Sequence, residues 1–109
     1  MYADIRYEPL IATPAKPELN DAQRLLRTSI DLLNKGGWCQ HALKNAWGQY
    51  CIIGAIHEAA TLSNRRAPGA AEAFIRIADQ IGGGHIPDWN DTPGRTKAEV
   101  IAMLTKAAE

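Results

Sequence analysis

Apolar residues at helical spacing, separated by glycines, are the feature that most constrains the fold of this chain. Between residues 20 and 37 they recur at intervals of three and four, which is the pattern of a helix with one buried stripe. The segments 70–81 and 96–107 show the same spacing, and the first of these stops at three consecutive glycines. The spacing therefore predicts three helices that each bury one face.

Two of these helices begin with the pattern of a capping box. Asn20 is followed three positions later by Gln23, and Thr96 is followed in the same way by Glu99. In a capping box each side chain bonds the backbone N–H of the other residue, which satisfies donors that a helix leaves free at its start. We therefore expect helices to begin directly after Asn20 and Thr96.

The segment from Tyr50 to Leu62 predicts a fourth helix of different character. It is apolar almost all round, so we expect neighbours on several of its sides. Gly54 costs about 1 kcal/mol of helix propensity relative to alanine, which indicates that another backbone comes close there. Before it, residues 42–50 suit either a short β-hairpin or a helical link, and residues 85–95 are rich enough in Pro, Gly and Asp to predict a loop.

The predicted fold class is therefore mainly α. We expect a compact bundle of about four helices that occupies residues 19–109 as a single domain, with one short β-hairpin as an open alternative near residues 42–50. Residues 1–18 are predicted to form an extended, proline-rich N-terminal arm, because each proline removes a donor and disfavours helix at the residue before it. The apolar side chains of the arm favour packing along its own domain over docking to a partner.

Charge and composition exclude several classes of function. The chain carries 12 Lys and Arg against 12 Asp and Glu, so nucleic acid is not an expected partner, since phosphate neutralisation needs a basic face. No apolar run approaches the roughly 18–20 residues of a membrane span, so we expect no membrane partner. Two cysteines are too few for a disulfide framework and indicate a reducing compartment, which predicts a cytoplasmic protein.

All three tryptophans lie outside the predicted helices, in segments that also carry polar side chains. An indole offers a large surface, a donor and few rotatable bonds, and so it suits a binding surface. Tryptophans there can also close the ends of a small helical core, with their N–H groups on backbone carbonyls, and both interpretations can hold together. The predicted binding face consists of Trp38, Trp47, Trp89, Asn90, Asp91 and Arg95.

A thiol nucleophile is the sharpest enzymatic alternative. Such a site needs a thiol, a histidine base and a group that orients the base, and these partners meet only in the fold. Cys51 opens an apolar helix, where a cysteine is usually an inert buried hydrophobe, unless it lies in the first turn and the helix dipole favours its thiolate. The candidate catalytic residues are Cys39, Cys51, His41, His85 and Asp91.

Neither a metal nor another cofactor is expected. His57 and Glu58 begin like the zinc-protease motif, but Thr61 stands where the second histidine ligand must be. The three glycines at 82–84 follow a helix rather than a strand and lack the spacing of a dinucleotide fingerprint, so they predict a helix stop.

Three segments together resemble a family of small uncharacterised proteins from bacterial and phage genomes. They are Gly37-Trp38-Cys39-Gln40, then Cys51-Ile52-Ile53-Gly54-Ala55-Ile56, then Trp89-Asn90-Asp91 with Arg95-Thr96 and Glu99-Val100-Ile101. The resemblance covers residues 25–108 and departs from the family pattern at His41, where glycine is usual, and in the shorter link 42–50. It implies a compact helical domain of phage or mobile-element origin and supplies no mechanism.

These observations favour a small, soluble, non-enzymatic protein that binds another protein as an accessory or inhibitor. The alternative is a small cysteine-dependent enzyme or ligand-binding domain that uses Cys51 or Cys39 with a histidine. A nucleic-acid-associated regulator is less favoured, and a homodimer stays open because a domain of this size often hides apolar surface by pairing.

Overall fold

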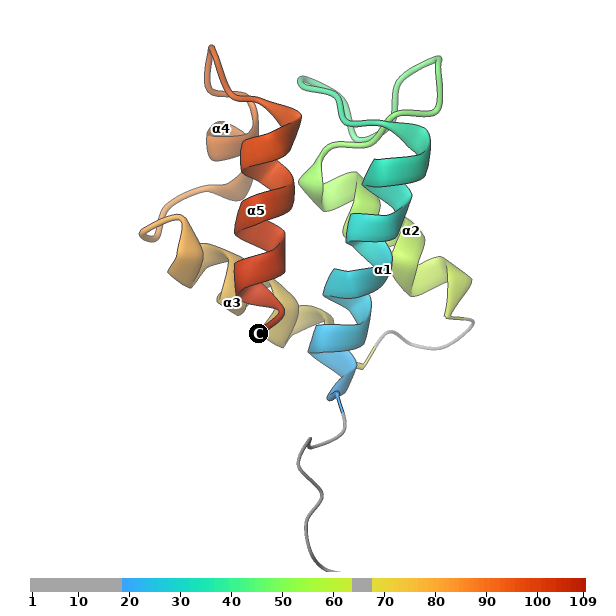
Figure 1. The fold of residues 1–109 in the computed structure, drawn as a ribbon, viewed down its shortest axis with the longest axis vertical. Coiled ribbons are helices and arrows are strands. Elements are labelled where there is room, and N and C mark those ends of the chain that lie inside the picture. The colour runs from blue at the N-terminus through green and yellow to red at the C-terminus, as the bar shows by residue number, and fades with distance from the viewer. Residues whose placement is uncertain (1–18, 64–67) are drawn as a thin grey trace, which may run out of the picture.

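The computed structural model describes residues 19–63 and 68–109, so the predicted N-terminal arm lies outside the described residues. Within these ranges the chain is mainly helical, as predicted, with two isolated β-bridges in place of strands. The helices of the described ranges, labelled in Figure 1, are α1 (Asp21–Gly36), α2 (Ile52–Leu62), α3 (Ala70–Gln80), α4 (Ile86–Asn90) and α5 (Lys97–Ala107).

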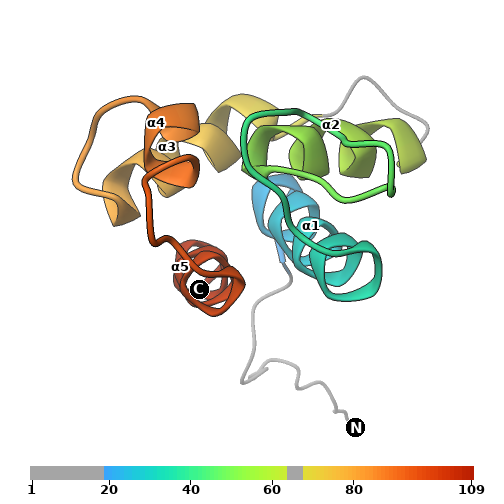
Figure 2. The same cartoon turned by 90° about the horizontal axis from the view of Figure 1, so that it is seen from above.

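The helices form two layers with the core between them. Figure 2 shows α1 and α5 next to each other in one layer, with α2, α3 and the short α4 in the other. α1 contacts α2, α3 and α5, while α4 contacts α2. Burial of the apolar stripes of α1, α2, α3 and α5 is the main stabilising contribution. Among the described residues, the fully buried large apolar side chains are Leu26, Leu33, Ile52, Ile56, Ile77, Val100 and Leu104.

Both predicted capping boxes are confirmed. Asn20 Oδ1 accepts the Gln23 N–H at 2.8 Å, and Gln23 Oε1 accepts the Asn20 N–H at 2.9 Å. At the start of α5, Thr96 Oγ1 accepts the Glu99 N–H at 3.1 Å and Glu99 Oε1 accepts the Thr96 N–H at 2.9 Å. These contacts join residues only three positions apart, which is why the sequence pattern predicts them.

The close approach expected at Gly54 is also confirmed, and its partner is the backbone of Leu43. A Cβ built on Gly54 would overlap the Leu43 carbonyl oxygen. Only glycine therefore lets the connection between α1 and α2 lie directly on α2.

The loop predicted for residues 85–95 is wrong for its first half, because Ile86–Asn90 forms α4. Pro87 lies in the first turn of this helix, where a backbone N–H would have no helical partner, so proline costs nothing there. Ile86 is buried against the core and anchors the helix. The predicted central helix also begins two residues late, at Ile52, with Cys51 as its N-cap.

Candidate functional site

The connection between α1 and α2 folds around Tyr50. Tyr50 N–H donates to the Gly37 carbonyl at 3.1 Å, and Cys39 N–H donates to the Tyr50 carbonyl at 2.9 Å, which pairs these segments in parallel. On the other side Lys44 pairs with Tyr50 in the antiparallel sense. Of the two structures predicted for residues 42–50, the connection thus takes a hairpin-like turn, reduced to a single bridge.

Asn45 organises the tip of this turn. Its Oδ1 accepts the N–H groups of Trp47 and Gln49, each at 3.0 Å, and its Nδ2 donates to Gln49 Oε1 at 2.6 Å. A side-chain oxygen that accepts the N–H two positions ahead forms an Asx turn. The turn holds Trp47 outward, and its side chain is 83% exposed.

A buried asparagine joins this connection to α4. Asn90 is 1% exposed, and its Oδ1 accepts the Trp38 indole N–H at 2.8 Å and the Ile52 N–H at 3.1 Å. Its Nδ2 donates to the Cys39 carbonyl at 3.2 Å and to Asp91 Oδ1 at 2.9 Å. The amide thus makes all four bonds available to it, and the Trp38 N–H meets this side chain rather than the predicted backbone carbonyl.

Three further hydrogen bonds hold the connection against the end of α4. Gln40 Nε2 donates to the carbonyls of Asn90 and Thr92 at 3.1 and 3.0 Å. The His41 N–H donates to Asp91 Oδ1 at 2.9 Å. To reach that carboxylate His41 takes a φ of 68°, a left-handed conformation that costs a non-glycine residue free energy.

The Asp91 carboxylate already accepts hydrogen bonds from two groups of the domain. The His41 backbone N–H and then the Asn90 side-chain amide bond it and hold its pKa below the ordinary value, because hydrogen bonds to the charged form favour that form. Its Oδ2 also lies 3.6 Å from Nδ1 of the His41 ring, which is 75% exposed.

The two candidate thiols are buried and bonded to backbone groups. The Cys39 Sγ–H donates to the carbonyls of Gln49 and Ala42 at 3.4 and 3.6 Å. Burial raises the pKa of Cys39, and the neighbouring Cys51 raises it further, so this thiol keeps its proton at neutral pH. Cys51 Sγ accepts the Gly54 N–H at 3.3 Å as the N-cap of α2.

The candidate histidines lie beside carboxylates. His41 lies beside Asp91, and His85 Nδ1 lies 3.4 Å from Asp88 Oδ1. Across residues 19–63 and 68–109 no hydrogen bond joins Cys39 or Cys51 to a histidine. The structure therefore brings His41 and Asp91 together, but it does not join them to a thiol.

Arg95 and Trp89 form a stacked pair between α4 and α5. The guanidinium carbon lies 3.7 Å from the centroid of the indole, and Arg95 Nε donates to the Trp89 carbonyl at 3.0 Å. The Arg95 side chain is 17% exposed and also approaches Glu99 Oε2 at 3.8 Å. This arginine is occupied by contacts within the domain, and it holds the turn before α5.

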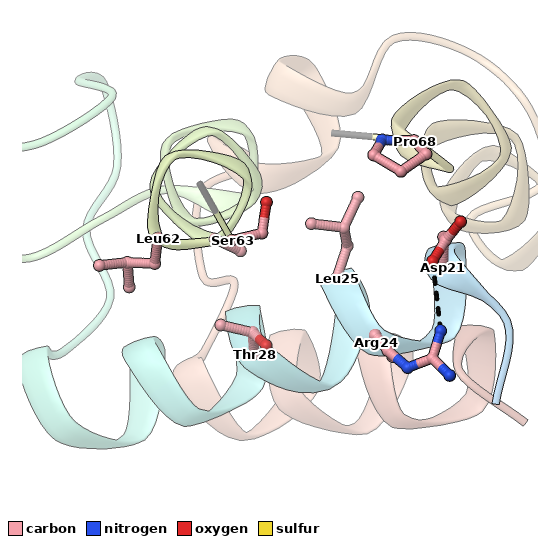
Figure 3. Close-up of a pocket in the computed structure, with 8 residues that line it drawn as sticks. Asp21, Arg24, Leu25, Thr28, Leu62, Ser63 and Pro68 are labelled. Atoms are coloured by element: carbon pink, nitrogen blue, oxygen red, sulfur yellow. Dashed lines mark hydrogen bonds and ion pairs between the residues drawn. The ribbon is translucent and has the colours of Figure 1, made fainter. Parts of the chain in front are cut away.

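A hollow of about 560 Å³ lies beside the N-terminal half of α1, away from the α1–α2 connection. Figure 3 shows Asp21, Arg24, Leu25 and Thr28 of α1 opposite the end of α2. The Asp21 carboxylate pairs with Arg24 at 3.2 Å. The described residues that line the hollow include neither histidine nor cysteine. They are Asp21, Arg24, Leu25, Thr28, Ala59, Leu62, Ser63 and Pro68.

Comparison with known proteins places the chain in a family. The family DUF6197, described as a family of unknown function, matches residues 17–109. The chain belongs to DUF6197. No curated protein and no solved structure matches this DUF6197 member.

Within the described ranges of this DUF6197 member, none of the helices has the length and apolar content needed to cross a bilayer. The same ranges contain no group of three or more His, Cys, Asp or Glu side chains arranged to hold a metal ion.

Three residues with clear roles near this site were missed by the sequence reasoning: Gln40, Leu43 and Asn45. The local signal for Asn45 was present, because an asparagine followed closely by a glycine, here Gly48, is typical of a turn. The roles of Gln40 and of the Leu43 carbonyl depend on partners far along the chain, so no local pattern announces them.

Proposed function

We propose that this domain is a non-enzymatic protein-binding module that inserts Trp47 into an apolar pocket of another protein. The observation that carries this proposal is the 83% exposure of Trp47 on a turn that the Asn45 side chain holds. Tryptophan is enriched among residues that dominate interface energies. A turn that is already ordered loses little conformational entropy on binding, which favours affinity.

The surroundings of Trp47 support a partner of particular chemistry. Leu43, in the same turn, is 55% exposed and adds apolar surface. Residues 39–51 contain Lys44 and His41 but no acidic residue. We therefore expect a partner whose apolar pocket is bordered by carboxylates, since complementary charge at the rim favours encounter.

The other two tryptophans of the predicted binding face are engaged by contacts within the domain. Trp38 is bonded to buried Asn90, and Trp89 is covered by Arg95. The exposed His41 ring lies 3.6 Å from the Asp91 carboxylate. In this proposal Trp47 contacts the partner, while Trp38 and Asn90 position the loop that carries it. Trp89 and Arg95 hold the turn before α5.

The proposal includes a cytoplasmic location, which rests on the two free cysteines, and a bacterial or phage source, which rests on the motif resemblance. A cysteine-dependent enzyme is not favoured, because the Cys39 thiol donates to two carbonyls and, within the described residues, neither thiol is hydrogen-bonded to a histidine.

The test compares Trp47→Ala with Ile75→Ala, a matched control because Ile75 is an apolar side chain on α3 that is 61% exposed. Proteins captured from host lysate by the tagged native chain are identified, purified and measured by calorimetry against all three forms. We expect Trp47→Ala to weaken binding at least about tenfold, and Ile75→Ala to leave it unchanged. Equal affinity of the native and Trp47→Ala chains would contradict the proposal.

Sedimentation of the native chain and of Trp47→Ala tests a second copy as the partner. A dimer that dissociates in the variant would make the pocket part of this same chain. A dimer that survives the substitution would leave Trp47 free for a different protein, which the calorimetry then measures.

A further inference from the structure

Cys39 and Cys51 are neighbours across the parallel pairing that begins the α1–α2 connection. The paired residues are Trp38 and Tyr50, and one position further along both segments come the two cysteines. Cys51 has extended backbone angles, with φ of −82° and ψ of 178°, so the pairing direction continues through it. Residues in register on paired segments lie about 4.8 Å apart.

The side chains of both cysteines point to the same face of this pairing. Trp38 and Tyr50 pack against the hydrophobic core, and successive side chains of an extended segment alternate between faces. Cys39 and Cys51 therefore share the face that the turn covers, where they are 8% and 7% exposed. Cys51 also contributes to the raised pKa of Cys39, which agrees with sulfurs that lie close together.

This placement suits a disulfide. Bridged cysteines have Cα atoms about 4.4–6.8 Å apart, and the spacing of paired segments falls inside that window. Both thiols are free in the present structure. We propose that Cys39 and Cys51 form a reversible intramolecular disulfide when the protein meets a low-molecular-weight disulfide as oxidant. This proposal is independent of the binding function of Trp47.

The hydrogen bonds of the two sulfurs indicate the order of the steps. Cys51 Sγ is an acceptor, bonded by the Gly54 N–H at the start of α2, whereas the Cys39 thiol is a donor to two carbonyls. The Cys51 thiol loses its proton to solvent, and its sulfur attacks one sulfur of the small disulfide. The S–S bond of the oxidant breaks, a mixed disulfide forms at Cys51, and the first small thiolate leaves and takes up a proton.

The second step closes the ring. Cys39 loses its proton to solvent and attacks the Cys51 sulfur, which forms the Cys39–Cys51 bond and releases the second small thiol. In total two protein thiols are oxidised by two electrons and one small disulfide is reduced to two thiols. Because the pKa of Cys39 is raised, the rate of this second step should still increase with pH above the ordinary pKa range of a thiol.

The experiment treats the reduced full chain with oxidised glutathione. We expect a monomer that is lighter by two hydrogens, has no free thiol and returns to its original mass with dithiothreitol, and proteolysis should give one peptide pair joined through Cys39 and Cys51. Cys39→Ser should stop at a stable glutathione adduct on Cys51. Cys51→Ser keeps a capping side chain at the start of α2. This variant should react with oxidised glutathione much more slowly than the native chain.

The same reaction in urea tests whether the disulfide depends on the folded structure or only on the short distance between the two cysteines along the chain. We expect the equilibrium constant for ring formation to be at least about tenfold larger for the folded chain than for the unfolded one, since folding holds the two sulfurs together. An equal constant in both states, two free thiols after treatment, or disulfides found only between molecules would each overturn the proposal.

Discussion

The side-chain oxygen of Asn90 accepts the indole N–H of Trp38 at 2.8 Å and the backbone N–H of Ile52 at 3.1 Å. One buried amide therefore joins α4, the segment after α1 and the first residue of α2. The turn that carries Trp47 lies between the two segments that this amide holds, so its position depends on a residue that is itself 1% exposed.

Asn90→Ala should lower the free energy of unfolding by about 2–4 kcal/mol, because it leaves the Trp38 and Ile52 donors without a partner in a buried place. Urea denaturation measures the change. Asn34→Ala is the matched control, since Asn34 is an exposed asparagine on α1, and it should change stability by less than about 0.5 kcal/mol. Equal effects of the two substitutions would show that the Asn90 network contributes little.

Gly54→Ala should destabilise the domain by about 1–3 kcal/mol, although alanine is the better helix former. The added methyl would overlap the Leu43 carbonyl oxygen and push the connection off α2. Thermal unfolding followed by circular dichroism measures the effect. Leu43→Ala is the control, because it keeps this carbonyl and removes a side chain that is 55% exposed, so its unfolding midpoint should stay near that of the native chain.

His41→Gly should raise the free energy of unfolding by up to about 1 kcal/mol. Its φ of 68° is strained for histidine and relaxed for glycine, and the bond to Asp91 comes from the backbone N–H, which glycine keeps. Ala42 is next in the chain and lies outside the left-handed region. Ala42→Gly should instead lower stability, because glycine gives the unfolded chain more backbone entropy that folding must remove. A destabilised His41→Gly would mean that the imidazole ring beside Asp91 matters more than the strain.

Asp91 should make stability depend on pH in acid. Its pKa is lowered in the folded chain, so its contribution is present above the unfolded pKa of about 3.9 and is lost as pH falls through the folded pKa. The native chain should therefore exceed Asp91→Asn in unfolding free energy at pH 7, and the difference should shrink toward pH 3. Urea titrations of both chains at the two pH values test this, and a difference that stays constant would assign the effect to other groups.

Features set by residues three or four positions apart could be predicted from the sequence. The capping boxes at Asn20 and Thr96 and the buried stripe of α1 belong to this class, because their partners lie within one turn of helix. A close approach at Gly54 could also be predicted, because glycine inside an apolar helix costs helix propensity and indicates that another backbone lies near. Its partner, the Leu43 carbonyl, could not.

Helix α4 shows why a loop predicted from composition was wrong. Pro87 and the nearby Gly, Asp and Asn residues predict a loop, yet burial of Ile86 against the core stabilises a short helix that local propensity does not favour. Tertiary packing outweighs propensity in so short a segment.

The sequence by itself determined where most helices begin and end, because capping and periodicity are local interactions between close neighbours in the chain. Only the tertiary structure decided which tryptophans are partly buried and which is exposed. Trp38 meets Asn90 from a segment 52 positions away, whereas the N–H of Trp47 is bonded by Asn45 two positions before it. Contacts between distant segments depend on how the helices pack, and that packing leaves Trp38 partly buried against the core and Trp47 in solvent.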